Sequence, residues 1–273
     1  MPGISQMRPV RWVVGFALLL FVWWAGAEYV SKARQGDLPE ATITRLYPRP
    51  EQVVAAALEL SASDFVDNIA VSSLRVLSGF LLAAVIAVPL GFVLGRVRSV
   101  AAALEPANDF LRYLPVAGFS TLAIFLVGTG DASAILVVFL GTVFHLVVAN
   151  TDAVRRVPAV YFDVGRTKGL SQVQLARRIL VPAAAPAIWD NLRISIGCAW
   201  SYVTLAEIMG SEGGLGHAIE VSRRYVRTDQ VLVWIITVGL LGVVSDVLMR
   251  VLGHRMFGWA SALSAVNDKV RKA

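Results

Sequence analysis

Uncharged apolar runs long enough to cross a membrane constrain this chain more than any other feature of its sequence. Residues 76–95, 113–130 and 132–150 each form such a run. An α-helix needs about 20 mostly apolar residues to cross the hydrocarbon core of a bilayer. Charged residues make up only 16% of the chain, whereas a soluble protein uses about a quarter to cover its surface. The sequence therefore indicates an all-α polytopic membrane protein and excludes an ordinary soluble enzyme.

Three further segments complete a prediction of six spans, because each holds enough apolar residues once its flanking residues are included. The expected spans are residues 12–30, 76–95, 113–130, 132–150, 188–209 and 231–250. They make residues 1–273 a single transmembrane domain, with an outer loop at 31–75 and an inner loop at 151–187. The first span, with Arg8 and Arg11 before it, also fits a signal peptide. Its tryptophans favour a retained helix, because tryptophan prefers membrane interfaces.

Lysine and arginine residues set the expected orientation. The formal net charge is +6 at pH 7. With both termini in the cytoplasm, the inner segments hold about twice as many lysines and arginines as the outer ones, as the positive-inside rule requires. We therefore predict cytoplasmic N- and C-termini. Topology explains the basic excess, so no nucleic-acid partner is needed.

The long inner loop carries the signals of two short helices joined by a sharp turn. Pro158 suits the start of the first helix, and Gly169 suits the left-handed residue that ends it. Ser171 and Gln174 form a capping box for the second helix, which Pro182 is expected to end. Spacing alone leaves two interpretations open: a knob that fits a partner's groove, or an amphipathic hairpin on the lipid surface.

The same loop resembles the EAA loop of ABC-importer permeases. That family's pattern is E-A-A, three residues, G, nine residues and I-x-L-P, and this chain has D-V-G, R-T-K, G, nine residues and I-L-V-P at matching spacing. Asp163 stands at the glutamate position, and Gly169 and Pro182 stand at the glycine and proline positions. Val164 and Gly165 depart from the two alanines. This resemblance favours the partner knob over the lipid-surface hairpin.

Other motifs resemble one branch of this family, the permeases for nitrate, sulfonates, taurine, bicarbonate and pyrimidine precursors. The segment L-A-E-I-M at 205–209, followed by G-G-L-G at 213–216, is similar to a stretch found there after the fifth span. The resemblance implies a type I ABC importer permease fold in the bacterial inner membrane. It also implies a small, anionic or zwitterionic solute.

The resemblance further implies the partners of the chain. No G-x-x-x-x-G-K-[ST] phosphate loop is present, so ATP and Mg²⁺ are expected on separate ATPase subunits and this chain is expected to be neither an enzyme nor a cofactor protein. A second permease copy, making a homodimer in the lipid bilayer, and a periplasmic solute-binding protein complete the expected assembly. The residues that the resemblance assigns to ATPase coupling are Asp163, Val164, Gly165, Arg166, Lys168, Gly169, Leu170, Ile179 and Pro182.

Candidates for the translocation path lie in the fourth and fifth spans. They are His145, Trp200, Ser201, Thr204 and Glu207. Ionisable residues within spans usually face protein or water and often serve function. Plainer interpretations stay open: a structural imidazole at His145, an interfacial carboxylate reaching water at Glu207, and helix packing through small residues at Ser201 and Thr204. Metal ligands at convincing spacing are absent from the sequence.

Two other classes of membrane protein fit this sequence less well than the importer. The first is a channel or an ATP-independent transporter. A channel would need a rigid filter, a ring of charge or a repeated pore segment, none of which the sequence shows, and it would have no use for the capped inner hairpin. An intramembrane hydrolase could nominally use Ser201 and His145, but no G-x-S-x-G motif surrounds the serine. The sequence therefore favours the importer permease.

Overall fold

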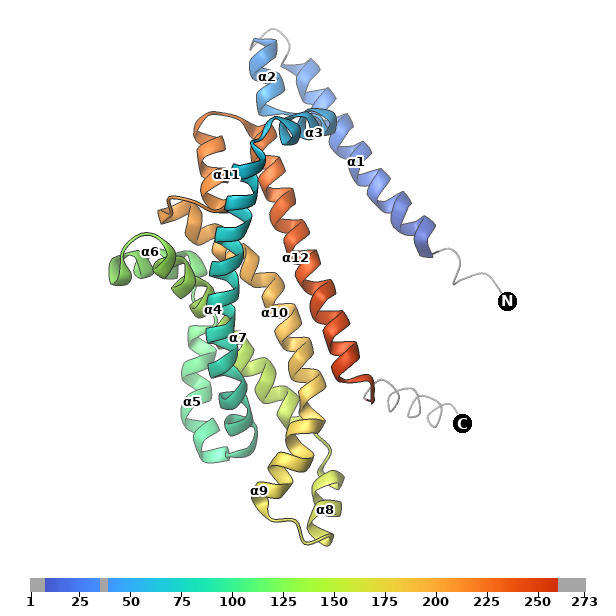
Figure 1. Ribbon diagram of the computed structural model, residues 1–273, viewed down its shortest axis with the longest axis vertical. Coiled ribbons are helices and arrows are strands. Elements are labelled where there is room, and N and C mark those ends of the chain that lie inside the picture. The colour runs from blue at the N-terminus through green and yellow to red at the C-terminus, as the bar shows by residue number, and fades with distance from the viewer. Residues whose placement is uncertain (1–7, 35–38, 260–273) are drawn as a thin grey trace, which may run out of the picture.

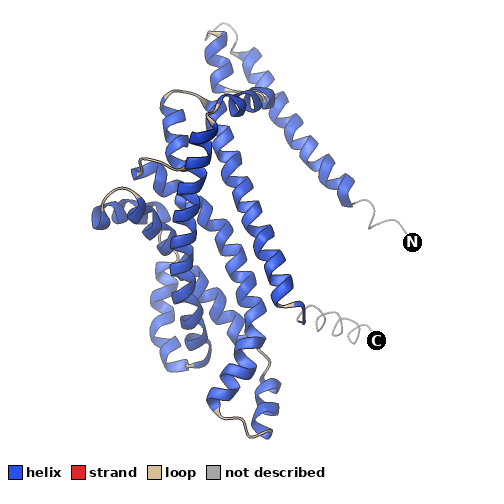
Figure 2. Cartoon of the chain, viewed as in Figure 1, coloured by secondary structure: helices blue, strands red, loops and turns tan. Residues whose placement is uncertain are grey.

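The computed structural model describes residues 8–34 and 39–259, and the described part of the chain is built from helices without strands (Figures 1 and 2). In chain order the elements are α1 Arg8–Ala33, α2 Glu40–Leu46, α3 Pro50–Glu59, α4 Ala62–Arg96, α5 Arg98–Leu111, α6 Val116–Val127, α7 Asp131–Arg155, α8 Ala159–Thr167, α9 Gln172–Leu175, the π-helix η1 Ala176–Leu180, α10 Val181–Gly210, α11 Leu215–Arg224 and α12 Thr228–Met256. The expectation of an all-α chain is confirmed.

The centre of the bundle is the pair α4 and α7, which lie against each other along most of their length (Figure 1). Small residues recur at every fourth position on the contacting face of α4: Gly79, Ala83, Ala87 and Gly91 are all buried. A Cβ at Gly79 would run into the side chain of Val138 on α7. Small residues of this kind let membrane helices approach closely and pack through van der Waals contact. The spacing therefore fixes which face of α4 meets α7.

Three of the described helices, α4, α7 and α12, are long and apolar enough to cross a membrane, and α5 with α6 form a further candidate bent by 95°. α6 has only 12 residues, about 18 Å at 1.5 Å per residue, which is short for the expected span at 113–130. Pro115 disfavours a helical conformation at the residue before it, and the chain bends there. α10 has 30 residues but carries Asp190, Arg193 and Glu207. The six-span count stays a prediction.

The molecule is elongated, with two different ends (Figure 1). One end is formed by α8 and α9 with the turn between them, residues 159–175, which we call the elbow. The other, where α2, α3 and α11 lie, we call the far end. α1 leans out from the bundle and is attached at the far end, where the indole nitrogen of Trp23 donates to the carbonyl oxygen of Pro48 at 3.2 Å. The elbow is thus exposed below the bundle, and α1 presents apolar side chains to its surroundings.

Candidate functional site

The turn of the elbow has the hydrogen bonds of a Schellman motif. The amide of Leu170 donates to the carbonyl of Gly165 at 3.1 Å, and the amide of Gly169 donates to the carbonyl of Arg166 at 2.9 Å. Gly169 lies in the left-handed region, with φ of +75°, which glycine adopts without the steric penalty of a Cβ. The prediction of a left-handed glycine at this position is confirmed.

The second helix of the elbow begins with the predicted capping box. The amide of Ser171 donates to the side-chain oxygen of Gln174 at 2.9 Å, and the amide of Gln174 donates to the hydroxyl of Ser171 at 3.4 Å. These bonds satisfy two amides that the start of a helix leaves without partners. Local sequence therefore specifies both sides of the turn.

The inner face of the elbow is apolar and closely packed. Phe162, Leu175 and Leu180 are buried in one cluster with residues of α7 and α10. A Cβ at Gly165 would collide with the side chains of Leu175 and Ile179, so glycine at this position lets α8 approach α9 and η1. The departure from alanine at Gly165 thus has a structural reason.

Pro182 does not end the second helix, and this expectation was wrong. α9 continues through the π-helix η1 into α10, and the amide of Val181 donates to the carbonyl of Ala176, five residues back. A proline has no amide hydrogen and its ring clashes with the carbonyl four residues earlier in an α-helix. The wider π-turn just before Pro182 relieves that conflict. One continuous helical rod therefore runs from the elbow to the far end.

The residues assigned to ATPase coupling divide into an exposed set and a packed set. The exposed residues are Asp163, Val164, Arg166, Lys168 and Gly169 on the elbow, and Pro182 at the start of α10. Gly165 is buried, and Leu170 and Ile179 are half-buried against it. Asp163 pairs with Arg166 at 3.4 Å, and both side chains are exposed. The exposed set can contact a partner, whereas the packed set maintains the shape of the elbow.

A buried cluster of charged groups lies at the other end of the rod. Glu207 on α10 is only 1% exposed. Its carboxylate accepts hydrogen bonds from the hydroxyl of Ser72 at 2.8 Å, from Arg75 Nη1 at 2.9 Å and from the amide of Gly216 at 2.8 Å. The hydroxyl of Ser72 also accepts from the amide of Leu215 at 2.8 Å. Buried charges are stable only when paired and hydrogen-bonded in this way.

Arg75 joins three segments at this end. Its Nε and Nη2 donate to Asp131 Oδ1 at 2.7 Å and 2.5 Å, and its Nη1 also donates to the carbonyl of Gly213 at 2.7 Å. The Arg75 side chain is 6% exposed, whereas that of Asp131 is 74% exposed. Together with its bond to Glu207, Arg75 ties α4 to the start of α7, the end of α10 and the loop that follows. We call Ser72, Arg75, Asp131 and Glu207 the far-end network.

Two glycines allow the loop at 213–216 to close over Glu207. Gly214 has φ of +101°, and a Cβ at either Gly214 or Gly216 would collide with the Glu207 side chain. Sequence reasoning singled out this loop by resemblance and Glu207 also as an ionisable residue within a span, but it missed Ser72, Arg75 and Asp131. The available signal was position: Arg75 and Asp131 are isolated charges that directly border uncharged runs.

The structure does not bring the five path candidates together. Ser201 and Trp200 line a cavity of about 350 Å³ between α10 and α12, and the indole of Trp200 donates to the hydroxyl of Ser245 at 3.0 Å. His145 lines a separate cavity of about 170 Å³ beside α5 and α6. Glu207 points into the far-end network, and the hydroxyl of Thr204 donates to a backbone carbonyl of its own helix at 2.8 Å.

The imidazole of His145 has partners on both nitrogens. Nδ1 lies 3.0 Å from the carbonyl of Gly141, and Nε2 lies 2.9 Å from the hydroxyl of Ser195. A carbonyl oxygen can only accept, so Nδ1 carries the hydrogen in this contact. These bonds give His145 a role in joining α7 to α10. Which residues line the path stays a prediction. Among residues 8–34 and 39–259, no group of three histidine, cysteine, aspartate or glutamate residues could hold a metal ion.

Comparison with known sequences agrees with this architecture. The family model described as binding-protein-dependent transport system inner membrane component matches residues 87–258. The chain is 31% identical to a putative ABC transporter permease protein of Methanocaldococcus jannaschii, over 78% of this chain and 82% of the relative. It is 30% identical to a nitrate import permease protein of Synechocystis, over 89% and 87%. It is also 30% identical to a putative aliphatic sulfonates transport permease protein of Bacillus subtilis, over 79% and 78%.

Solved structures share the fold. A chain of a methionine ABC transporter in an inward-facing conformation matches with a TM-score of 0.60 at 19% identity, covering 72% of this chain and 97% of that chain. A chain of a bacterial alginate ABC transporter, solved in complex with a pentasaccharide-bound periplasmic protein, matches with a TM-score of 0.58 at 13% identity, covering 92% and 97%. The predicted fold class, a type I ABC importer permease, is confirmed, and the chain belongs to the family of binding-protein-dependent transport system inner membrane components.

Proposed function

We propose that this chain is the permease subunit of an ATP-driven importer for a small anionic or zwitterionic solute. The observation that carries the proposal is the exposed, doubly capped elbow at the end of a helical rod that reaches the far-end network. Relatives named for nitrate and aliphatic sulfonates support the anionic class of solute. ATP is hydrolysed on separate subunits, which bind the elbow from the cytoplasm.

The rod gives the elbow a way to act on the opposite side of the membrane. Closure of the ATPase subunits moves the exposed face of the elbow, and α8 transmits the movement through the contacts of Gly165 with Leu175 and Ile179. Because α9, η1 and α10 are continuous, the end of α10 at Glu207 moves as well. ATP binding and product release then shift the population between two packings of the same helices.

The expected assembly needs a second copy of the chain and an external binding protein. α1 leans out from the bundle and exposes large apolar side chains such as Leu19 and Phe21, which suits contact with lipid and with a second permease in a homodimer. A periplasmic solute-binding protein delivers the solute to the far end, which faces outward when both termini are cytoplasmic. In this proposal ATP and Mg²⁺ are bound by the ATPase subunits, and the permease itself supplies neither a cofactor nor a metal ion.

Site-specific crosslinking tests the coupling proposal. The chain has one cysteine, Cys198, so a Cys198→Ser background allows single cysteines to be placed at will. Lys168→Cys puts a thiol on the exposed elbow, and Glu212→Cys places the control on an exposed residue of the far end. We expect a crosslink to the cognate ATPase from position 168 and none from position 212.

The crosslinking experiment and a flux assay distinguish the importer from its alternatives. Absence of any crosslink from the elbow in the assembled, transport-active complex would contradict the coupling proposal. Solute flux through the purified permease in vesicles without ATPase subunits would favour a channel or an ATP-independent transporter instead. We expect no flux and no ATP hydrolysis from the isolated chain.

A further inference from the structure

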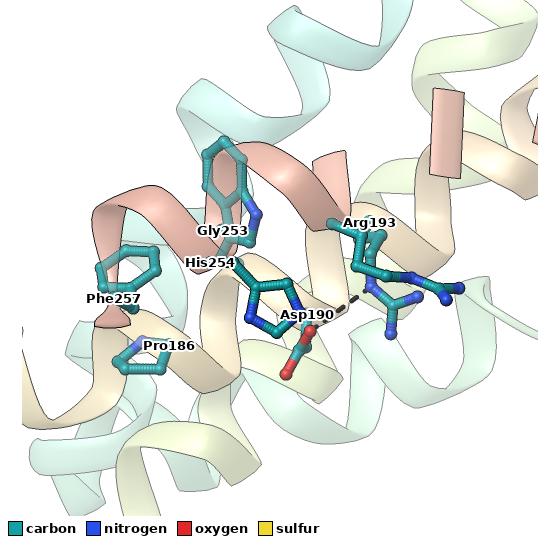
Figure 3. A pocket seen from close by; sticks show the side chains of 8 residues that line it. Pro186, Asp190, Arg193, Gly253, His254 and Phe257 are labelled. Atoms are coloured by element: carbon teal, nitrogen blue, oxygen red, sulfur yellow. Dashed lines mark hydrogen bonds and ion pairs between the residues drawn. The ribbon is translucent and has the colours of Figure 1, made fainter. Parts of the chain in front are cut away.

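A polar and aromatic cleft lies between α10 and α12 near the elbow, outside the far-end network and the elbow itself. It has a volume of about 420 Å³. Each helix lines it with residues at positions i, i+3, i+4 and i+7, which share one helical face. The lining residues are Pro186, Trp189, Asp190 and Arg193 on α10, Arg250, Gly253 and His254 on α12, and Phe257 directly after α12 (Figure 3).

The apolar wall of the cleft is fixed in place. The indole nitrogen of Trp189 donates to the carbonyl of Met249 at 2.8 Å, and the Trp189 ring lies 6.2 Å from that of Phe257 between centroids. A Cβ at Gly253 would collide with the indole, so glycine lets the ring lie flat against α12. This wall gives the cleft a rigid aromatic side.

The opposite side of the cleft carries two arginines held by one aspartate. Asp246 Oδ1 accepts from Arg193 Nη1 at 2.7 Å, and Asp246 Oδ2 accepts from Arg250 Nη2 at 2.6 Å. Each guanidinium has five N–H donors, so both retain donors for another acceptor. The Arg250 side chain is 57% exposed, and its open donors suit a phosphate group.

Asp190 adds a negative group to the same cleft. Its side chain is 65% exposed and has only a long contact with Arg193 Nε, at 3.4 Å, as the dashed line in Figure 3 shows. The two arginines are thus balanced by Asp190 and Asp246, and His254 supplies a further ring nitrogen. A ligand with one negative and one positive group matches this arrangement better than a simple anion does.

The position of the cleft along α12 indicates the source of such a ligand. Residues 231–249 of α12 carry Asp246 as their one charged residue, and Arg250 is the first residue after this run. The end of an apolar run marks the headgroup level of the bilayer, where tryptophan and arginine are common. Pockets between helices that offer arginine side chains at this level can bind the phosphate of a lipid headgroup.

We propose that this cleft binds a phospholipid headgroup that carries both a phosphate and a primary ammonium, as phosphatidylethanolamine does. Arg250 and Arg193 donate to the phosphate, and Asp190 accepts from the ammonium. Trp189 and Phe257 contact the glycerol and the upper part of the acyl chains. The lipid thereby joins α10 to α12 beside the elbow, in the leaflet that the expected orientation places on the cytoplasmic side.

Native mass spectrometry of the full chain tests the proposal with three lipids in equal amounts. Phosphatidylethanolamine has both groups, phosphatidylcholine lacks ammonium N–H donors, and phosphatidylglycerol lacks the cation. We expect wild type to retain phosphatidylethanolamine about tenfold over the other two, since hydrogen bonds to charged groups are worth that much. Asp190→Asn should lose the preference over phosphatidylcholine, and Arg250→Gln should lose retention of all three.

Arg255→Gln is the matched control, because Arg255 is exposed on the same helix but does not line the cleft. Equal losses in Arg255→Gln and Arg250→Gln, or preferred retention of phosphatidylglycerol by wild type, would overturn the proposal. So would binding of inorganic phosphate or free phosphoethanolamine as tight as that of the lipid, since the site would then serve a soluble phosphate. If Arg250→Gln elutes as an aggregate in size-exclusion chromatography, Asp190→Asn still tests the proposal. The Asp190 side chain is exposed, so it can be changed without loss of folding.

Discussion

Two turns in this molecule share one hydrogen-bond pattern but differ in the residue at its left-handed position. In the elbow that residue is Gly169, with φ of +75°. At the far end, between α11 and α12, it is Val226, with φ of +55°. There the amide of Val226 donates to the carbonyl of Arg223 at 3.0 Å, and the amide of Arg227 donates to that of Ser222 at 2.9 Å. Both turns are Schellman motifs.

The difference shows where each turn gets its geometry. A β-branched residue in the left-handed region is strained, so other contacts must hold Val226 there. Arg227, the next residue, binds Asp229 at 3.0 Å and Glu59 of α3 at 3.3 Å. The far-end turn thus has ion pairs to the start of α12 and to α3 beside its strained residue, whereas the elbow turn follows from its own glycine and caps. A turn that is specified by its own residues suits a part that meets another subunit.

The largest expected effect is at the far end, where buried and paired charges hold the segments together. Glu207→Ala removes the acceptor for Ser72, Arg75 and the amide of Gly216. Breaking a buried ion pair from one side costs about 3–5 kcal/mol. We expect a marked fall in the melting temperature of the purified protein. The exposed Glu212 provides the control, because Glu212→Ala should leave the melting temperature unchanged.

Retained stability in Glu207→Ala would mean that the far-end network does not hold these segments together. A double-mutant cycle sharpens the point. Arg75→Met combined with Glu207→Ala should cost less than the sum of the single changes, because removal of both partners leaves no unpaired buried charge of that pair. Strict additivity would contradict direct coupling between Arg75 and Glu207.

The second prediction concerns the elbow turn. Gly169→Val forces a β-branched residue into the left-handed conformation, at a cost of roughly 1–2 kcal/mol. Because Gly169 is exposed and a Cβ there meets no neighbour, the change acts through the backbone alone. We expect ATP-driven uptake in vesicles to fall while the amount of protein in the membrane stays near that of wild type.

Gly169→Asn is the control for that experiment, since asparagine adopts the left-handed region more readily than other residues with a side chain. It should keep most of the uptake. Normal transport by Gly169→Val with its ATPase bound would show that the shape of the turn does not matter for coupling.

The contrast between the two ends also explains what the sequence could predict. The elbow was predictable because Gly169, Ser171 and Gln174 act within a few residues of one another. The far-end network was not, because Arg75 and Glu207 lie 132 residues apart in the chain and only the packing of α4 against α10 brings them together. The prediction that Pro182 ends the second helix was wrong because a π-turn before it changes the hydrogen-bond register. Sequence spacing does not show that change.

The third prediction makes the opposite substitution, valine to glycine, at the far-end turn. Val226→Gly removes the left-handed strain, and the entropy that glycine loses on folding offsets part of the gain, so we expect a stabilisation of about 0.5–1 kcal/mol. The side chain of Val226 is 47% exposed, and little packing is lost. Thermal unfolding measures the change, and Val226→Ala is the matched control that keeps a Cβ. A lower melting temperature in Val226→Gly than in Val226→Ala would show that the turn is unstrained.

The smallest expected effect is the pH dependence of the ion pairs on α11. Hydrogen bonds from Arg223 at 2.7 Å and from Arg224 at 3.0 Å lower the pKa of Glu220 from its ordinary 4.5 to about 2. A lowered pKa in the folded state means that this stabilisation is complete above pH 4.5 and is lost as the pH falls toward 2. The arginines are exposed, so the effect should be modest and should shrink in high salt. Melting temperatures of wild type and Glu220→Gln should therefore converge between pH 4.5 and 2. A constant difference over that range would show that Arg223 and Arg224 stabilise α11 without the charge of Glu220. The ion pairs of Arg227 would then be the electrostatic support of the strained turn at Val226.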